Sequence, residues 1–280
     1  MQGKTVVITG ATSGIGQVAA AKLAGMGARI VFVARDPARG EALLRHLNAI
    51  APGIPHAAYY ADLSRLSEMK RVAGEIAAAE PKIDVLINNA GAMFTPRQLT
   101  ADGLEQTFAL NHMSYFVLTN LLLENLKAAG KARIVSTASD AHRGGKFDFA
   151  DLQSEQRYRA FVVYARSKLM NILFTRELAR RLQGTAVTAN CLHPGFVATR
   201  FGDNNTGLLK TVFGFAKNFA LSPEKGARTL LYLATSPEVD GVSGKYFDKS
   251  RPTTPSKEAQ DDAAAAKLWQ VSAEISGIGI

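Results

Sequence analysis

The stretch KTVVITGATSGIG, residues 4–16, decides the fold, because it joins a short apolar run to a glycine-rich turn and an alanine-rich helical pattern. Its first six residues are largely β-branched and apolar, which is typical of a buried strand. The residues that follow Gly16 include many alanines, and alanine is the strongest helix former. A strand, a glycine turn and a helix in this order predict the opening of a βαβ unit.

The same alternation continues along the chain. Short β-branched runs alternate with longer amphipathic stretches, which predicts parallel strands joined by helices. We therefore expect an α/β fold, a single-domain doubly wound parallel sheet of about seven strands with helices on both faces. Further strands are expected at 28–34, 56–61, 83–89, 132–138, 186–192 and 244–248, and helices near 14–26, 38–50, 65–79, 103–129, 157–183 and 223–235.

No Gly/Ser-rich linker or internal repeat divides the chain. We expect one dinucleotide-binding catalytic domain over 1–250 and a C-terminal helical tail over 251–280 that serves for packing. Residues 196–222 mix glycine and asparagine with large apolar side chains. This segment is interpreted either as a mobile lid over an apolar pocket or as a pair of surface helices packed on the body.

The composition narrows the class of protein. Of the 280 residues, 47% are hydrophobic and 20% charged, which excludes a disordered or fibrous chain. The single cysteine, Cys191, cannot form an intramolecular disulfide, and no Cys/His cluster predicts a metal site. With no export signal before the first strand, we expect a cytoplasmic protein. The apolar runs are shorter than the roughly 20 residues that span a bilayer, so no transmembrane anchor is expected.

The chain is basic, with 33 Lys and Arg against 24 Asp and Glu and a net charge of +9. Such a charge suits anionic partners, among them nucleic acid, lipid headgroups and phosphorylated cofactors. The densest basic stretch, Arg157 to Arg181, is interrupted by apolar residues at helical spacing. We interpret it as a solvated helix face, and no nucleic-acid partner is expected.

The glycine-rich turn is a candidate phosphate cradle. Glycines let a backbone approach a pyrophosphate closely, and the N-terminus of the next helix supplies free N–H groups. The spacing is G-x-x-x-G-x-G rather than the common G-x-G-x-x-G, and a plain tight connection is the alternative. The candidate cofactor-binding residues here are Gly10, Thr12, Ser13, Gly14, Ile15 and Gly16.

The second expected strand ends at Ala34, where an acidic residue would bind the ribose 2′-hydroxyl of NAD. Arg35 follows instead, and a guanidinium suits the 2′-phosphate of NADP. We therefore expect NADP(H) in preference to NAD(H). The alternative is that Arg35 is an exposed residue at the start of a helix beside Asp36.

Tyr164 and Lys168 are four positions apart in an expected helix, so both side chains project from one face. A lysine ammonium beside a phenol stabilises the phenolate, and we expect it to lower the pKa of Tyr164 towards neutrality. Such a pair is common by chance and gains meaning only from other residues.

Those residues occur in chain order. Thr9 to Gly16, Asn88 to Gly91, Asn111, Ser139, Tyr164 with Lys168, and Pro194-Gly195 together resemble the short-chain dehydrogenase/reductase family, over roughly residues 3–248. The stretches Ala34 to Asp36, Ser139 to His142, Tyr164 to Lys168, His193 to Gly195 and Gly241 to Tyr246 look like its retinol dehydrogenase-like members.

The resemblance implies a role for each matching residue. Tyr164 would be the acid in carbonyl reduction and the base in alcohol oxidation, and Lys168 would lower its pKa and hold the nicotinamide ribose. Ser139 would bond the substrate oxygen, and Asn111 would hold a water in a proton relay. The implied cofactor contacts are Asp62 at the adenine, Leu63, Asn89, Ala90 and Gly91 on the adenosine side, and Pro194, Gly195, Val197 and Thr199 around the nicotinamide.

Two departures from the family pattern leave alternatives. Ser136 is an alternative to Ser139 as the serine that bonds the substrate oxygen. We prefer Ser139 because it lies nearer the carboxyl end of the strand. The gap before Tyr164 is long, and the insertion from His142 to Arg159 is expected to shape the substrate pocket. His193 would either approach the nicotinamide or serve the structure.

The implied function is an NADP-dependent oxidoreductase that moves hydride between nicotinamide and a lipophilic aldehyde, ketone or alcohol, such as a retinoid, a steroid or a fatty aldehyde. A non-catalytic NADP-binding regulatory or scaffold protein is the alternative. The resemblance also implies a homodimer or tetramer formed through the long helices 103–129 and 157–183.

Overall fold

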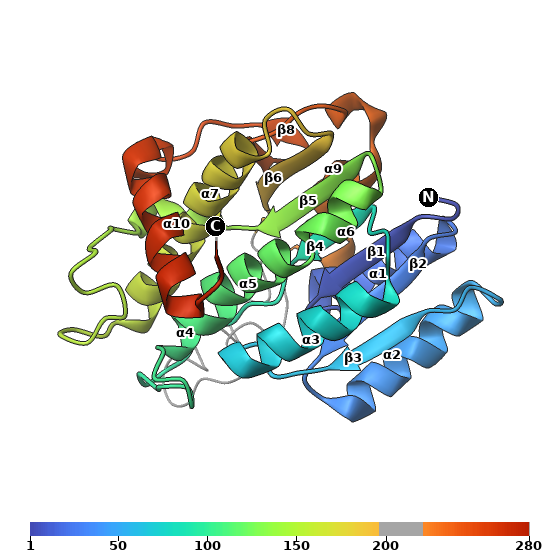
Figure 1. Ribbon diagram of the computed structural model, residues 1–280, viewed down its shortest axis with the longest axis horizontal. Helices are drawn as coiled ribbons and strands as arrows, with labels where there is room; N and C mark the ends of the chain where they lie inside the picture. The colour runs from blue at the N-terminus through green and yellow to red at the C-terminus, as the bar shows by residue number, and fades with distance from the viewer. Residues whose placement is uncertain (196–220, 280) are drawn as a thin grey trace.

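One sheet runs through the molecule, with strands in the order β3-β2-β1-β4-β5-β6-β7-β8 (Figure 1). The computed structural model of the protein describes residues 1–195 and 221–279. All neighbouring strands are parallel except β7 and β8. The strands are β1 (Thr5–Thr9), β2 (Arg29–Ala34), β3 (Ala57–Tyr60), β4 (Val85–Asn88), β5 (Ala132–Thr137), β6 (Val187–His193), β7 (Tyr246–Asp248) and β8 (Arg251–Pro252).

Both faces of the sheet are covered by helices, which is why its strands read as continuous apolar runs. Val7 of β1 pairs with Val31 of β2 and Leu86 of β4, and all three belong to the core on one face. Their neighbours Val6 and Ile8 belong to the core on the other face. The latter face carries α1 (Gly14–Gly25), α2 (Pro37–Ile50) and α9 (Pro223–Thr235), and the former α3 (Leu66–Ala79), α5 (Ser114–Leu121), α6 (Leu123–Ala128), α7 (Ala160–Arg181) and α10 (Asp262–Ser276).

The predicted doubly wound α/β fold is thus confirmed, and one strand was missed. The sheet has eight strands where about seven were expected. The eighth, β8, has only two residues and runs antiparallel to β7. Two residues carry no period, so the sequence pattern had no means of indicating it.

The order of strands reverses between β1 and β4, because the chain fills the β3 side before it crosses to the β5 side. In open α/β sheets such a point leaves a crevice at the carboxyl ends of the strands. The glycine turn after β1 and the Asn-Asn-Ala-Gly stretch after β4 both lie there.

The helix expected over 103–129 is broken into pieces. Gly103 has a φ of +75°, and the carboxylate of Glu105 accepts the N–H groups of Thr107 (2.8 Å) and Phe108 (2.7 Å). This cap starts the helix at Gln106 rather than at 103. The pieces are α4 (Gln106–Phe108), a π-helical turn η1 (Ala109–Met113), α5 and α6.

The arginines at both ends of the basic stretch Arg157 to Arg181, such as Arg157 and Arg180, are exposed as expected, whereas the apolar side of α7 between them is buried and α10 packs along it (Figure 1). Trp269 of α10 stacks on Phe174 with ring centroids 5.7 Å apart. Its ring also meets Phe116 of α5 edge-on at 5.0 Å. Part of the helix surface that the resemblance assigned to a dimer interface is therefore covered by α10 of the same chain.

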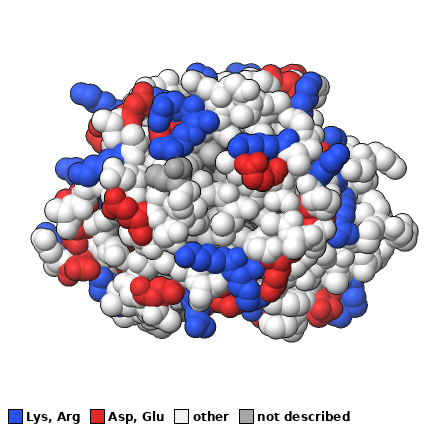
Figure 2. Space-filling model, viewed as in Figure 1, with Lys and Arg blue, Asp and Glu red and all other residues white. Residues whose placement is uncertain are grey.

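Charged side chains of both signs are interspersed on the face in Figure 2, around a largely uncharged centre. The net positive charge is not gathered into one basic surface on that face. In the described part of the chain, no helix has the length and apolar character needed to cross a bilayer. The described residues also form three short 3₁₀ turns: η2 (Asp140–Gly144), η4 (Pro237–Val239) and η5 (Glu258–Gln260).

Candidate active site

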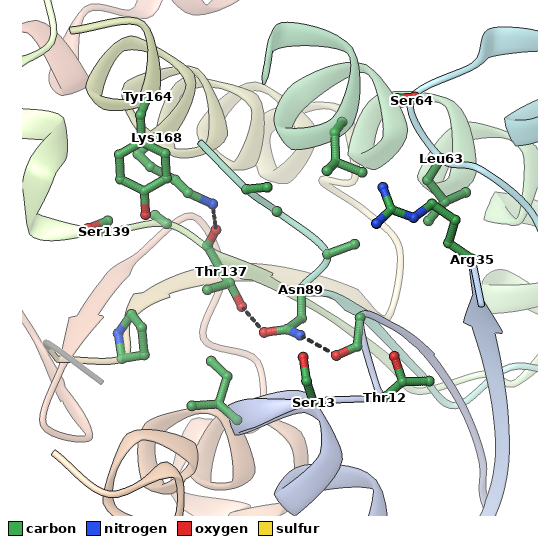
Figure 3. Close-up of a pocket in the computed structure, with 18 of the residues that line it drawn as sticks. Thr12, Ser13, Arg35, Leu63, Ser64, Asn89, Thr137, Ser139, Tyr164 and Lys168 are labelled. Atoms are coloured by element: carbon green, nitrogen blue, oxygen red, sulfur yellow. Dashed lines mark hydrogen bonds between the residues drawn. The ribbon is translucent and has the colours of Figure 1, made fainter. Parts of the chain in front are cut away.

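A cavity of about 1010 Å³ opens at the carboxyl ends of the strands (Figure 3). It gathers most of the predicted site residues. Gly14, Gly16 and Asn111 are not among its lining residues, and Val197 and Thr199 lie outside the described residues. The predicted residues that line it are Gly10, Thr12, Ser13, Ile15, Arg35, Asp62, Leu63, Asn89, Ala90, Gly91, Ser139, Tyr164, Lys168, Pro194 and Gly195.

The glycine turn at one end of the cavity is tightly packed. Gly10 has a φ of +67°, a conformation that favours glycine. Gly16 lies against the carbonyl of Gly10, and a Cβ added there would come within 2.6 Å of Nδ2 of Asn89. Ser13 precedes α1 without capping it through its side chain, so the side chain of Ser13 leaves the first N–H groups of α1 available beside the cavity that Ser13 and Ile15 line. This arrangement suits a pyrophosphate.

Asn89 has a structural task that sequence reasoning missed. Its Nδ2 donates to the carbonyls of Thr9 and Gly10, both at 3.2 Å, and its Oδ1 accepts from Thr137 Oγ1 at 3.2 Å (Figure 3). The hydroxyl of Thr9 accepts the N–H groups of Asn89 and Ala90, both at 3.0 Å. These contacts join β1, β4 and β5 under the cavity, and no local pattern signals them because the residues are far apart in the chain.

The guanidinium of Arg35 points into the cavity beside Leu63 (Figure 3). Asp36, its neighbour, caps α2 by accepting the N–H of Arg39 at 3.3 Å and forms an ion pair with the same arginine. The carboxylate of Asp36 therefore interacts with Arg39. Among the described residues Arg35 forms no salt bridge, and its charge faces the cavity.

Tyr164 and Lys168 reach the cavity from α7, as their spacing predicts. The phenol of Tyr164 points towards Ser139, which follows β5 (Figure 3). Lys168 Nζ donates to the carbonyl of Thr137 at 3.1 Å and lies 5.6 Å from the centroid of the Tyr164 ring. Three of the four side chains that the resemblance assigns to the chemistry are therefore neighbours in space.

The expected lowering of the Tyr164 pKa is not seen. Burial raises the pKa of Tyr164 to about 12, and a hydrogen bond with Ser139 opposes the shift. Burial also lowers the pKa of Lys168 to about 7. The pKa of Tyr164 does not fall because the ammonium of Lys168 is directed at the Thr137 carbonyl and because the phenol and the ammonium have both lost contact with water. Near neutral pH Tyr164 is a neutral phenol, which can donate a proton.

The lowered pKa of Lys168 predicts that the stability of the protein depends on pH. Because its pKa falls from 10.5 to about 7 on folding, the unfolded chain binds more protons between these values, and the free energy of unfolding rises with pH there. Lys168→Met removes this contribution. Urea denaturation of both proteins at pH 7.5 and pH 9 should show the wild type gaining about 2 kcal/mol relative to the variant. An equal pH dependence of the two proteins would contradict the shift.

The structure distinguishes the two candidate serines by position. Ser136 is 1% exposed within β5, and its hydroxyl oxygen has no hydrogen-bond partner among the described residues. Ser139 lines the cavity, and its Oγ accepts the N–H of Ala141 at 3.2 Å. Of the two, Ser139 is the one within reach of a molecule in the cavity.

Asn111 lies in the π-helical turn η1 and does not line the cavity. Its Oδ1 accepts the N–H of Ala92, and its Nδ2 donates to the carbonyl of Ala92 and to Ser167 Oγ, all at 2.9 Å. Three of the four hydrogen-bonding positions of the amide are thus occupied. The side chain links the segment after β4 to α7, and a π turn often marks a functional site.

The insertion from His142 to Arg159 does not line the cavity directly. Phe147 and Phe149 pack on each other with centroids 4.7 Å apart, and Lys267 of α10 lies 4.5 Å from the centroid of Phe149. None of the described residues that line the cavity comes from the insertion. Phe147 and Phe149 pack against the core, whereas the hydroxyl of Tyr158 donates to the carbonyl of Phe94 at 2.6 Å. Phe94, Leu110 and Phe161 supply apolar lining.

The expected lid at 196–222 lies outside the described residues except for its last two. Leu221 lies against Gly195 at the cavity, where a Cβ on Gly195 would come within 2.5 Å of its Cδ1. Ser222 caps α9 by accepting the N–H of Lys225 at 3.4 Å. Among the described residues, no cluster of three or more His, Cys, Asp or Glu could hold a metal ion.

Comparison with known proteins identifies relatives along the whole chain. The family model described as short chain dehydrogenase matches residues 4–207. Retinol dehydrogenase 14 from Homo sapiens is 44% identical, over 99% of this chain and 88% of its own. Retinol dehydrogenase 12 from Homo sapiens is 41% identical, over 99% of this chain and 88% of its own.

Solved structures share the fold. A protein from Mycobacterium paratuberculosis superposes with a TM-score of 0.79 at 35% identity, over 99% of this chain and 94% of its own. A short chain dehydrogenase from Burkholderia cenocepacia in complex with NADP has a TM-score of 0.69 at 25% identity, over 88% of this chain and 96% of its own. The chain therefore belongs to the short-chain dehydrogenase/reductase family, and it is an oxidoreductase that acts on CH–OH and carbonyl groups.

Proposed function

We propose that the protein uses NADP(H) to interconvert a lipophilic aldehyde or ketone and the corresponding alcohol. The observation that carries this proposal is the phenol of Tyr164 beside Ser139, in the same cavity as the charge of Arg35, which no described acidic side chain pairs. The cavity thus combines a proton donor with a site for a phosphate. A retinoid, a steroid or a fatty aldehyde has the apolar character that the lining favours.

The residues present fit the cofactor. The first N–H groups of α1, with Thr12 and Ser13, would hold the pyrophosphate, and Arg35 would pair with a 2′-phosphate. The carboxylate of Asp62 accepts from both the N–H (3.0 Å) and the hydroxyl (2.8 Å) of Ser64, and with Leu63 it would border the adenine. The nicotinamide supplies hydride chemistry that no side chain can perform.

The side chains of the protein would transfer the proton and stabilise the charge that develops on the substrate oxygen. In reduction, Ser139 Oγ would donate a hydrogen bond to the substrate oxygen while the phenol of Tyr164 transfers its proton to it. Lys168 would hold the ribose and limit the charge on the phenolate. Asn111, fixed between Ala92 and Ser167, would keep α7 in register with the segment after β4, where a water of the relay would bind.

The apolar part of the cavity supports a lipophilic substrate. Phe161, one helical turn before Tyr164, is 59% exposed at the cavity, and Phe94 and Leu110 line it as well. Relatives named retinol dehydrogenases support the same class.

The test is a titration with NADPH and NADH, followed by turnover of aldehydes and ketones of increasing chain length on the same sample. We expect tighter binding of NADPH and a kcat/KM that rises with apolar chain length, by up to about tenfold for each two methylenes. Cofactor binding without turnover of any carbonyl would favour the non-catalytic alternative. Binding of neither cofactor would refute the proposal.

Arg35→Ala tests the cofactor preference directly. We expect the Kd for NADPH to rise about tenfold or more while the Kd for NADH changes less than about twofold, because only the 2′-phosphate loses a charged hydrogen bond. Arg45→Ala, an exposed arginine of α2 outside the cavity, is the matched control. An equal rise for both cofactors would show that Arg35 does not read the 2′ position.

A further inference from the structure

Two histidines hold opposite sides of the peptide bond that follows Ser139. His142 Nδ1 lies 2.7 Å from the carbonyl oxygen of Ser139, and His193 Nδ1 accepts the N–H of Asp140 at 3.1 Å. The carbonyl and the N–H belong to one planar peptide unit. The unit is therefore clamped from both of its polar sides.

The protonation of His142 follows from its partners. Its Nε2 accepts the N–H of Ser256 at 3.0 Å, and a backbone N–H can only donate. The carbonyl of Ser139 can only accept, so Nδ1 carries the proton. The ring is fully buried, and burial lowers its pKa. His142 is thus a neutral bridge between the Ser139 carbonyl and the segment that leads to α10.

Residues 254–256 help to hold His142 in place. Arg143 donates to Asp140 Oδ1 at 2.8 Å and to the carbonyl of Thr254 at 3.2 Å, beside the contact between Ser256 and His142. The ring of Tyr246 packs on His142 with centroids 5.1 Å apart. His142 does not line the cavity, so it reaches the site only through the peptide that it holds.

We propose that His142, seated by Ser256 and assisted by His193, is a positioning residue that aims the hydroxyl of Ser139 at the substrate oxygen. The inference rests on the proposed role of Ser139. Ser139 has an extended backbone, with φ −166° and ψ 154°, and rotation of the next peptide would change ψ and the setting of its side chain. The segment before α10, expected only to pack, thereby becomes part of the active site.

Variants of His142 separate its two bonds. The amide nitrogen of asparagine can replace Nδ1 and keep donating to the carbonyl of Ser139. The amide oxygen of glutamine can replace Nε2 and keep accepting the N–H of Ser256. We expect His142→Asn to retain kcat within about threefold, His142→Gln to lose about tenfold and His142→Phe about thirtyfold. The Kd for NADPH should stay within about twofold in all three. His46→Phe, at an exposed histidine of α2, is the matched control.

A double-mutant cycle distinguishes positioning from general damage. If His142 acts through Ser139, His142→Phe should cost less than about twofold in a Ser139→Ala background, where no hydroxyl remains to aim. A loss in that background equal to the loss in the wild type would overturn the proposal. So would a His142→Gln variant with unaltered kcat.

A readout that needs no turnover accompanies the kinetics. Hydrogen exchange of the Asp140 and Ala141 amides should accelerate at least about tenfold in His142→Phe and remain near wild type in His142→Asn. Unchanged exchange in His142→Phe would overturn the clamp. If the wild type reduced no carbonyl, the proposed function would fail, and exchange would still decide whether His142 holds this peptide.

Discussion

Tyr164→Phe should lower kcat for carbonyl reduction by roughly a thousandfold while the Kd for NADPH changes less than about twofold. Phenylalanine keeps the ring and loses only the hydroxyl, so the packing of α7 is preserved. The proton donor that points at Ser139 is then absent, and no other described side chain in the cavity holds a neutral phenol. Steady-state kinetics and a fluorescence titration of NADPH measure the two quantities.

Tyr232→Phe on α9 is the control for this substitution. Its hydroxyl contacts Glu238 at 3.0 Å and does not line the cavity, so kcat should stay within about twofold of the wild type. A Tyr164→Phe protein that binds NADPH and retains a tenth or more of the activity would place the proton donor elsewhere.

Gly16→Ala should raise the Kd for NADPH by more than about a hundredfold. The added Cβ would collide with the backbone carbonyl of Gly10 and with the amide of Asn89, so either α1 or the turn must move. Movement of either one displaces the N–H groups proposed for the pyrophosphate. The measurement is a titration monitored by fluorescence, with circular dichroism and a melting curve to confirm that the variant is folded.

Gly74→Ala in α3 provides the comparison, because a Cβ there meets nothing within 4 Å. It should leave the Kd for NADPH unchanged and stabilise the protein by about 1 kcal/mol through the higher helix propensity of alanine. If a folded Gly16→Ala protein bound NADPH like the wild type, the glycine turn would not be the phosphate site.

The sheet was predictable because both of its faces are buried, which gives each central strand a continuous apolar run. The order of motifs along the chain then located half of the described residues that line the cavity, since parallel strands bring their carboxyl ends to one edge. Side chains such as Arg35, Ser139 and Tyr164 could be assigned to the cavity from sequence.

What escaped prediction depends on contacts between distant residues. The bond from Ser256 to His142 spans 114 positions and leaves no local pattern. The π-helical turn at Ala109–Met113 is made of ordinary helix-compatible residues, so the expected helix looked continuous. The pKa of Tyr164 was expected to fall because the spacing in the sequence places Lys168 near it. The spacing does not show where the ammonium of Lys168 points or how much water both groups have lost.

The two outer strands of the sheet have a consequence for how copies of the protein meet. Unpaired backbone groups along a sheet edge invite another chain to add a strand, which is a route to aggregation. On one side β8 is only two residues long and ends in Pro252, which has no N–H to offer. On the other side, β3 has four residues, and Arg71 donates at 2.7 Å to the carbonyl of Tyr60 at the open edge of this strand. Both edges of the described sheet thus discourage strand addition by another copy of the chain.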